Sequence, residues 1–343
     1  MVRLKDIASK AAVSLMTVSK ALRDAPDVSA ATTARIKALA QTMGYVPDPT
    51  ARGLRTRKTR MLGIILSTTT NPVFSRILLA LESRAQELGF EVLLACTQNQ
   101  PEREELCIRR LLARRVDGLF LSPVYRMGND SGVYRDLLTS GVPVVLLGHS
   151  APFCSRFVNV ESDDIAGGYA GTKHLLSLGH TRIAFLSGPP AAPWSEERFE
   201  GYRRALREFN LDVDDKLVFQ AGRSIEDGAK AAEQILNERT GATAIQAVND
   251  LVATGCADAF LRNGIAIPSE MSVAGFGNIL FSEYARVPLT TVSQPKYRLG
   301  LAAMEMMQVF LRGQRPESRR LPADLVIRGS TGIAPASPVD RRP

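Results

Sequence analysis

The sequence predicts a small all-α headpiece followed by a larger α/β body built from two doubly wound parallel sheets. Hydrophobic residues recur at helical spacing over residues 4–43. From residue 61 onward, short apolar runs alternate with amphipathic stretches, which is the pattern of parallel strands joined by helices. The 343 residues suffice for a small domain plus one large or two medium ones, and the hydrophobic content of 45% is ordinary for a folded protein.

Two short helices are predicted at the start of the chain. Their apolar faces consist of Leu4, Ile7, Ala8 and Ala11 in the first helix and of Val18, Ala21 and Leu22 in the second. Ser14 is a good N-cap for the second helix, and residues 11–14 form the break between the two. This spacing suits a helix-turn-helix that places its second helix in the major groove of DNA. It suits equally two amphipathic helices of a small bundle.

A third helix and a linker complete the predicted headpiece. Ser29 can cap a helix that runs to Met43, and Gly44 is a residue type that ends helices. The buried stripe of this helix would consist of Ile36, Leu39, Ala40 and Met43. Residues 45–60 are rich in Lys, Arg and Pro, which predicts a loose basic linker.

Positive charge is concentrated in the first 60 residues. Of the 43 Lys and Arg residues 12 lie there, and of the 35 Asp and Glu residues 4 do, which leaves 31 of each kind in the rest of the chain. The formal net charge of +8 therefore belongs entirely to residues 1–60. A basic segment on a neutral body suits phosphate neutralisation. The alternative is a basic domain that is merely soluble.

The body repeats a strand–helix alternation. Its predicted strands are residues 62–67, 90–95, 118–122, 142–147, 157–160, 183–187, 217–220, 244–248 and 271–276, with more strand in the tail. Its predicted helices include residues 71–88, 101–114, 163–178 and 297–312, and further helices are expected between the strands from residue 183 to residue 276. These strands are too many for one ordinary sheet. We therefore expect two similar α/β halves.

The cysteine pattern and the absence of membrane signals indicate in which cellular compartment the protein acts. The chain contains four cysteines: Cys96, Cys107, Cys154 and Cys256. They form no C-x-x-C pair, which indicates small apolar residues in a reducing compartment rather than disulfides or metal ligands. No apolar run approaches the roughly 20 residues that a spanning helix needs, and Lys5, Asp6 and Lys10 interrupt any signal-peptide pattern. We expect a cytoplasmic protein with no membrane partner, no metal and no other cofactor.

Several stretches carry a resemblance to a known family. KDIASKAAVSLMTVSKAL (5–22) and GYVPDPTARGLR (44–55) resemble the LacI/GalR family of bacterial transcription regulators. Body phrases such as RRVDGLFLSP (114–123) and PLTTVSQPKYRLG (288–300) extend the resemblance from about residue 2 to 336. The family usually has glycine in the headpiece turn, where this chain has Ala12. A non-glycine residue at positive φ costs on the order of 1 kcal/mol, which is tolerable.

The resemblance implies a domain organisation. It implies a helix-turn-helix headpiece at 1–46, a hinge helix or linker at 47–60, and an effector-binding and dimerisation body at 61–343 with a periplasmic-binding-protein-like fold. The first subdomain of the body would comprise about 61–161 plus 293–322. The second would comprise about 162–292 plus 323–336. The chain would cross three times between the subdomains, with an effector cleft between them.

The DNA-binding candidates lie in the second helix and the hinge. They are Leu15, Met16, Thr17, Ser19, Lys20 and Arg23 in the headpiece and Arg52, Leu54 and Arg55 in the hinge. Leu15 and Met16 are apolar, so they suit contact with thymine methyl groups, although they could instead belong to the core. Leu54 would be the wedge that enters the minor groove and bends the duplex, unless residues 45–60 are only a disordered basic linker.

The effector-binding candidates follow predicted strand ends or match family positions. They are Asn71, Phe74, His149, Trp194, Arg198, Asn249, Asp250, Asn278 and Gln294. In two loops the family often has Asp, whereas this chain has Gly148-His149 and Gly277-Asn278. The loss of two hydroxyl-binding carboxylates argues against a simple hexose. Asp250 could alternatively be a structural residue at a helix N-terminus.

The functional hypothesis is a DNA-binding transcription regulator, specifically a repressor. The resemblance implies a homodimer that binds a palindromic operator and is controlled by a small molecule such as a sugar or sugar derivative. A nucleobase or nucleoside effector is the alternative. A solute-binding protein would share the body but needs no headpiece. An enzyme is disfavoured because the sequence has no phosphate-binding G-x-x-x-x-G-K-[ST] loop, nucleophile elbow or metal-spaced His/Cys set.

Overall fold

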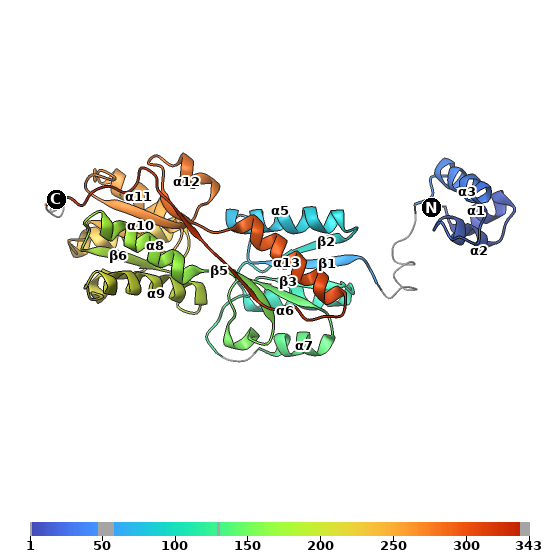
Figure 1. Cartoon of the computed structure of the whole chain (residues 1–343), viewed down its shortest axis with the longest axis horizontal. Coiled ribbons are helices and arrows are strands. Elements are labelled where there is room, and N and C mark those ends of the chain that lie inside the picture. Colours follow the sequence, from blue (N-terminus) through green and yellow to red (C-terminus); the bar gives the residue numbers. More distant parts are fainter. Residues whose placement is uncertain (1, 47–57, 129–130, 337–343) are drawn as a thin grey trace. The chain divides into compact units, whose positions relative to one another are not determined.

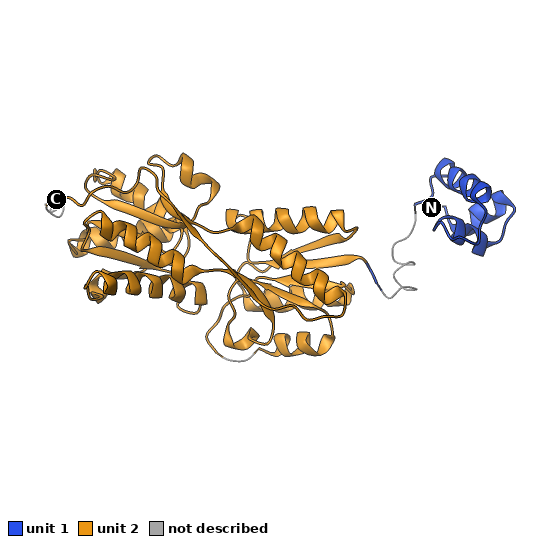
Figure 2. Ribbon diagram, in the orientation of Figure 1, with its two compact units in different colours: residues 1–59 blue, residues 60–343 orange. Residues whose placement is uncertain are grey.

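The computed structural model describes residues 2–46, 58–128 and 131–336. The chain divides into two compact units, 1–59 and 60–343 (Figure 2). The predicted hinge at 47–57 lies outside the described residues. In the part of the chain that is described, no helix has the length and apolar character to cross a membrane.

The first unit contains the three predicted helices. They are α1 (Leu4–Ala11), α2 (Leu15–Ala21) and α3 (Ala30–Thr42). Ser14 and Ser29 cap α2 and α3, since each side-chain oxygen accepts a hydrogen bond from the backbone N–H three residues later. Gly44 follows α3 with φ 68°, as a helix-ending glycine does. The apolar faces of the three helices meet in one small core, centred on Ile7, Val18, Ala21 and Ile36.

The turn between α1 and α2 uses a left-handed residue that is not glycine. Ala12 has φ 50° and ψ 44°, and its side chain is exposed. Arg35 of α3 donates a hydrogen bond from Nη2 to the Ala11 carbonyl at 3.1 Å, which ties α3 to the end of α1. The departure from glycine is therefore accommodated by backbone strain of about 1 kcal/mol rather than by a different turn.

Replacing Ala12 by glycine should stabilise the headpiece. We expect Ala12→Gly to raise the free energy of unfolding of residues 1–59 by about 0.5–1 kcal/mol, because the strained φ is relieved. The matched control is Ala38→Gly on the exposed face of α3, which should destabilise by about the same amount. Thermal unfolding followed by circular dichroism measures both changes. A destabilising Ala12→Gly would show that the turn is not strained.

The first half of the body is a six-stranded sheet with helices on both faces (Figure 1). Its strands are β1 (Met61–Leu66), β2 (Glu91–Cys96), β3 (Gly118–Leu121), β4 (Val144–Leu147), β5 (Val158–Ser162) and β11 (Arg319–Leu321), in the order β11-β5-β4-β3-β1-β2. All neighbouring strands are parallel. The helices α5 (Pro72–Glu87) and α13 (Lys296–Leu311) cover one face, and α6 (Pro101–Ala113) and α7 (Gly132–Ser140) cover the other.

The second half repeats this arrangement. Its strands are β6 (Ile183–Ser187), β7 (Val218–Gln220), β8 (Ala244–Ala247), β9 (Ser272–Gly277), β10 (Thr290–Ser293) and β12 (Asp324–Val326), in the order β12-β10-β9-β8-β6-β7. The strands are parallel except for β12, which pairs antiparallel with β10. The helices α8 (Asp164–Ser177) and α9 (Pro193–Glu208) cover one face, and α10 (Ile225–Glu238) and α11 (Asp250–Arg262) cover the other.

Three connections join the halves. The chain passes from β5 into α8, returns from β10 into α13, and passes again from β11 into β12. In Figure 1 these segments run alongside one another between the two sheets. The carboxyl ends of the strands in both sheets consequently face the same region, where an open parallel sheet binds ligands.

The predicted fold class is confirmed, although four of its short elements were not predicted. The nine predicted strands of the body begin within two residues of the observed ones. The sequence interpretation did not include α7 or the five-residue helix α12 (Leu280–Tyr284). It also did not include the short 3-10 turns at Pro152–Cys154 and Asp215–Leu217.

Candidate DNA-binding surface and effector cavity

The first turn of α2 presents two large apolar side chains to solvent. Leu15 is 53% exposed and Met16 is 62% exposed, whereas Val18 is fully buried. Ser14 fixes this turn, because its Oγ accepts from the Thr17 backbone N–H at 3.0 Å and contacts the Thr17 hydroxyl at 2.9 Å. Leu15 and Met16 are thus not part of the headpiece core. Their exposure leaves them free to contact a partner.

The polar candidates of α2 are partly occupied within the headpiece. Lys20 forms an ion pair with Asp27, and Arg23 donates from Nε to the Ser19 carbonyl at 2.7 Å. Both interactions are solvent-exposed, so they are easily exchanged. The three hinge candidates, Arg52, Leu54 and Arg55, lie outside the described residues.

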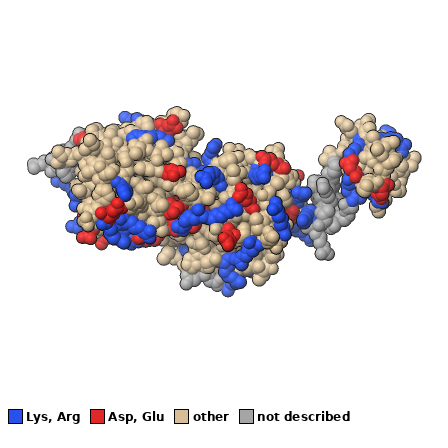
Figure 3. Space-filling view, in the orientation of Figure 1, with Lys and Arg blue, Asp and Glu red and all other residues tan. Residues whose placement is uncertain are grey.

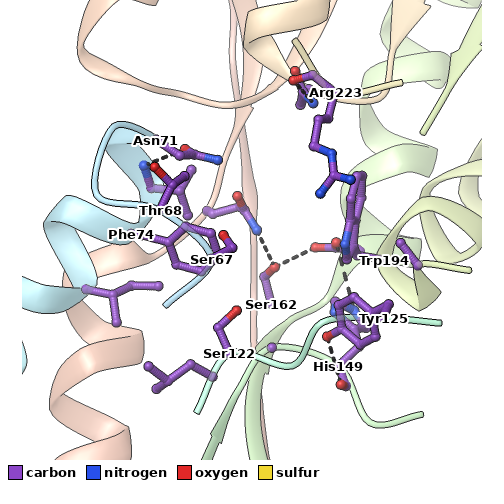
Figure 4. Close-up of a pocket in the computed structure, with 18 of the residues that line it drawn as sticks. Ser67, Thr68, Asn71, Phe74, Ser122, Tyr125, His149, Ser162, Trp194 and Arg223 are labelled. Carbon is purple, nitrogen blue, oxygen red and sulfur yellow. Dashed lines mark hydrogen bonds and ion pairs between the residues drawn. The ribbon is translucent and has the colours of Figure 1, made fainter. Parts of the chain in front are cut away.

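A cavity of about 340 Å³ lies between the two halves of the body (Figure 4). Residues that follow the carboxyl ends of strands in both sheets line it, such as Ser67 after β1, Ser122 after β3 and Asn249 after β8. Eight predicted candidates line this cavity: Asn71, Phe74, His149, Trp194, Arg198, Asn249, Asp250 and Gln294.

Asn278 is the effector candidate that the structure places outside the cavity lining. Its Nδ2 donates to Ser293 Oγ at 3.1 Å, and its Oδ1 accepts from Arg328 Nη2 at 2.8 Å. It also adopts a left-handed φ of 48° directly after β9. These contacts give Asn278 a turn-forming role in the second half.

Arg198 is buried in the cavity wall and is heavily engaged. Its Nε and Nη2 contact Asp164 Oδ2 at 2.9 and 2.7 Å, and its Nη1 donates to the Val248 carbonyl at 2.6 Å. The guanidinium also lies 3.8 Å from the ring centroid of Phe276 and 5.0 Å from that of Trp194. Of its five N–H groups, two remain for a ligand.

Hydrogen bonds at the cavity join the two halves. Gln294 donates to Ser162 Oγ at 2.8 Å, and Ser162 donates to Asp164, so the second and first connections are linked. His149, after β4, lies 3.1 Å from Glu197 of α9. The lysine that opens α13, Lys296, donates to the carbonyls of Gly277 and Asn278 at 2.5 and 2.8 Å.

Two of these groups have shifted proton affinities. Burial lowers the pKa of His149, but the hydrogen bond to Glu197 and the charges of Asp164 and Glu161 outweigh burial, so the pKa lies above its ordinary value. Burial lowers the pKa of Lys296 to about 8, despite the opposing charge of Asp250. Lys296 therefore titrates within reach of neutral pH. Among the described residues, no group of His, Cys, Asp and Glu side chains is arranged to hold a metal ion.

Comparison with known proteins identifies the family. Residues 3–48 match the model described as bacterial regulatory proteins, lacI family, and residues 172–331 match a periplasmic binding protein-like domain. The HTH-type transcriptional repressor CytR of Escherichia coli (strain K12) is 32% identical over 336 residues, which cover 97% of each chain. This chain belongs to the lacI family.

Two solved structures resemble nearly the whole chain. The lac repressor dimer bound to operator and an anti-inducer has a TM-score of 0.87 at 27% identity, covering 96% of this chain and 99% of the repressor. The complex of the transcriptional regulator CelR with cellobiose has a TM-score of 0.73 at 27% identity, covering 96% and 100%. The relatives are DNA-binding transcription regulators rather than enzymes, which confirms that part of the functional hypothesis.

Asp250 of this lacI-family chain lies at the cavity wall with its carboxylate already used. Oδ2 accepts from the Ile279 backbone N–H at 2.9 Å and from the Ser282 hydroxyl at 2.6 Å, and Oδ1 accepts from the Thr291 hydroxyl at 2.5 Å. The residue is 1% exposed. These contacts favour the structural alternative, in which Asp250 anchors the loop between β9 and α12.

Asp250→Asn should therefore destabilise the body. We expect a loss of about 2–4 kcal/mol in the free energy of unfolding, because the amide cannot accept all three hydrogen bonds. Urea denaturation followed by the fluorescence of Trp194, the chain's single tryptophan, measures the change. Asp258→Asn on the same helix is the control; it removes exposed ion pairs and should cost less than about 1 kcal/mol. If Asp250→Asn leaves the free energy of unfolding unchanged, Asp250 is not a structural anchor and the prediction that it binds the effector is favoured instead.

The sequence interpretation missed several polar residues that line the cavity. They include Ser67, Thr68, Ser122, Tyr125, Ser162 and Arg223. Ser67 and Ser122 were themselves predicted as strand ends, so position at the carboxyl end of a parallel strand was an available signal. Arg223 lies in the loop between β7 and α10, and no local pattern in that loop distinguishes it from a surface arginine.

Proposed function

We propose that the protein is a homodimeric transcriptional repressor whose affinity for a palindromic operator is set by a small molecule, a sugar or sugar derivative, bound in the cavity. The observation that carries this proposal is the combination of an exposed apolar first turn on α2 with a cavity lined by both halves of the body. We assign residues 1–46 to the headpiece, 47–60 to the hinge and 61–343 to the body. A regulator that binds the chromosome acts in the cytoplasm.

The charge distribution supports DNA binding through the first unit. The net charge of +8 belongs to residues 1–60, and Figure 3 shows Lys and Arg interspersed with Asp and Glu on the visible face of the body. Leu15 and Met16 would contact bases through thymine methyl groups, while Thr17, Ser19, Lys20 and Arg23 would contact bases or phosphates. In the hinge, Leu54 would enter the minor groove, flanked by Arg52 and Arg55.

A short apolar helix supports the homodimer. On α12, Leu280 is 69% exposed, Phe281 is 59% exposed and Tyr284 is 76% exposed. Three large apolar side chains on five consecutive residues are costly in water unless a partner covers them. A two-fold interface covers the same patch on both subunits, and a dimer presents two headpieces and two hinge leucines to a palindromic site. The matched lac repressor structure is itself a dimer.

The location of the cavity supports control by an effector. A ligand held between the halves can change operator affinity only if it binds two arrangements of the halves unequally. Ligand contacts from both sides of the cavity provide that difference. Trp194 and Phe74 present aromatic rings at the lining, which suit the apolar face of a sugar ring. The CelR relative was solved with cellobiose, a sugar.

Operator binding should depend steeply on salt. If the dimer neutralises six or more phosphates, log K should fall with log[salt] with a slope of about −5 or steeper. Gel-shift or anisotropy titrations at several salt concentrations measure the slope. The body alone, starting at Met61, should not bind DNA. A truncated body that shifts DNA would contradict the assignment of DNA binding to the headpiece.

A charge placed on α12 should dissociate the dimer. We expect Phe281→Glu to shift the protein to monomers at micromolar concentration, because two carboxylates would be buried near the two-fold axis without partners. Sedimentation measures the assembly, and operator affinity should fall with it. Met127→Glu is the matched control, since Met127 is an exposed apolar residue of the first half. If Phe281→Glu remains a dimer, α12 is not the interface.

A further inference from the structure

We infer that the cavity takes an anionic ligand, a sugar-sized polar molecule that carries a carboxylate or a phosphate, and that Arg223 recognises its charge. This inference rests on the proposed function, since it names the class of effector for the same cavity. It is carried by the state of the charged side chains in the lining: the carboxylates are occupied by neighbours, while one arginine is not.

The carboxylates at the cavity are satisfied within the protein. Asp250 accepts three hydrogen bonds from its own half. Asp164 is bonded to Arg198 and Ser162. Glu161 contacts Arg320 Nη2 at 2.7 Å and Asn159 Nδ2 at 2.8 Å. A neutral sugar is commonly held by carboxylates that accept from pairs of its hydroxyls, and these three have little acceptor capacity left for that purpose.

Arg223 is in the opposite state. Within the part of the chain that is described, its guanidinium has no hydrogen-bond or ion-pair partner. Figure 4 shows its side chain extending from the β7–α10 loop toward Trp194 at the cavity. By contrast, the charge of Arg198 is balanced by Asp164 at 2.7 Å.

The backbone beneath Arg223 is held in place. Asp227 Oδ2 accepts from the backbone N–H groups of Arg223 and Ser224, both at 2.9 Å. Asn249 Nδ2 donates to the Arg223 carbonyl at 3.3 Å. The loop is thereby fixed against α10 and α11, so within this loop only the Arg223 side chain has to be ordered when an anion binds.

The cavity wall formed by the first half of the body carries hydroxyl groups that have no hydrogen-bond partner among the described residues. Ser67 and Ser122 are 6% and 5% exposed, and neither hydroxyl has a hydrogen-bond partner among the described residues. Both point into the cavity region in Figure 4. A hydroxyl group that faces the cavity without a protein partner is available for a hydrogen bond to a ligand. A ligand that reaches both walls would place its polar ring at these serines and its anionic group at Arg223, within a volume of about 340 Å³.

The test compares matched neutral and anionic probes on the full-length protein. The pairs are glucose with gluconate, glucose with glucose 6-phosphate, and galactose with galacturonate, so the carboxylate and phosphate sources are separated. We expect at least one anionic probe to raise the melting temperature in a saturable manner, and its neutral partner to do so only at much higher concentration. Calorimetric titration then gives the affinity.

Substitution of Arg223 distinguishes binding in the cavity from binding elsewhere. Arg223→Gln should weaken the anionic probe by about 10- to 100-fold, the usual effect of losing one charge-assisted hydrogen bond. Arg223→Lys should recover part of that loss. The control is Lys230→Gln, which removes the same charge from an exposed position of α10 outside the cavity lining and should leave the affinity unchanged.

Three results would overturn the inference. The first is stabilisation by neutral sugars at lower concentration than by their anionic partners. The second is equal binding of the anionic probe to wild type and Arg223→Gln. The third is a failure of all anionic probes to stabilise wild type. The proposed function is judged separately by operator titration. A neutral sugar that changes operator affinity would support the assignment as an effector-controlled repressor and would contradict only the inference that the effector is anionic.

Discussion

The buried ion pair between Asp164 and Arg198 fixes the end of the first crossing to the second half of the body. Asp164 begins α8 directly after β5, and Arg198 lies on α9, so the pair fixes both helices beside the connection. Two glycines allow this approach, because a Cβ on Gly168 would lie 2.5 Å from the Arg198 carbonyl and one on Gly201 would lie 2.4 Å from that of Ile165. Removing one partner of such a pair typically costs about 3–5 kcal/mol, since the other charge is left buried and unpaired.

The contacts around this pair connect ligand binding to the arrangement of the halves. Gln294 reaches Asp164 through Ser162, while His149 and Lys296 contact the second half directly. A change in the angle between the halves must break or rebuild these bonds together. The pKa of His149 is raised in the folded protein. The stabilisation that protonated His149 gives to the contact between the halves is therefore complete below its ordinary pKa of 6.5 and is lost as pH rises through the raised pKa. The arrangement of the halves therefore carries a proton-linked component besides any ligand.

The sequence predicted what depends on local pattern. Caps such as Ser14 and Ser29 act within three residues, and apolar strand runs report burial directly, so helices and strands were located well. The structural role of Asp250 depends on Ser282 and Thr291, which lie 32 and 41 residues away in sequence. No local pattern reports whether a carboxylate at a strand end will be consumed by such distant donors. For the same reason Asn278, which follows a strand where the family often has Asp, lies outside the cavity lining.

In the headpiece, different side chains of α2 would provide affinity for DNA and specificity for the operator sequence. Leu15 and Met16 offer only apolar contacts, so hydrogen bonds to bases from this helix would come chiefly from Lys20, which the free protein pairs with Asp27. An exposed pair of this kind is worth about 0–1 kcal/mol, so DNA can displace Asp27 at little cost. On non-specific DNA, phosphates would serve as well as Asp27, and binding would remain electrostatic. In this proposal, discrimination between operator and non-specific DNA depends on how thymine methyl groups and the bent duplex fit the apolar side chains. Those contacts stabilise the complex only on the correct sequence.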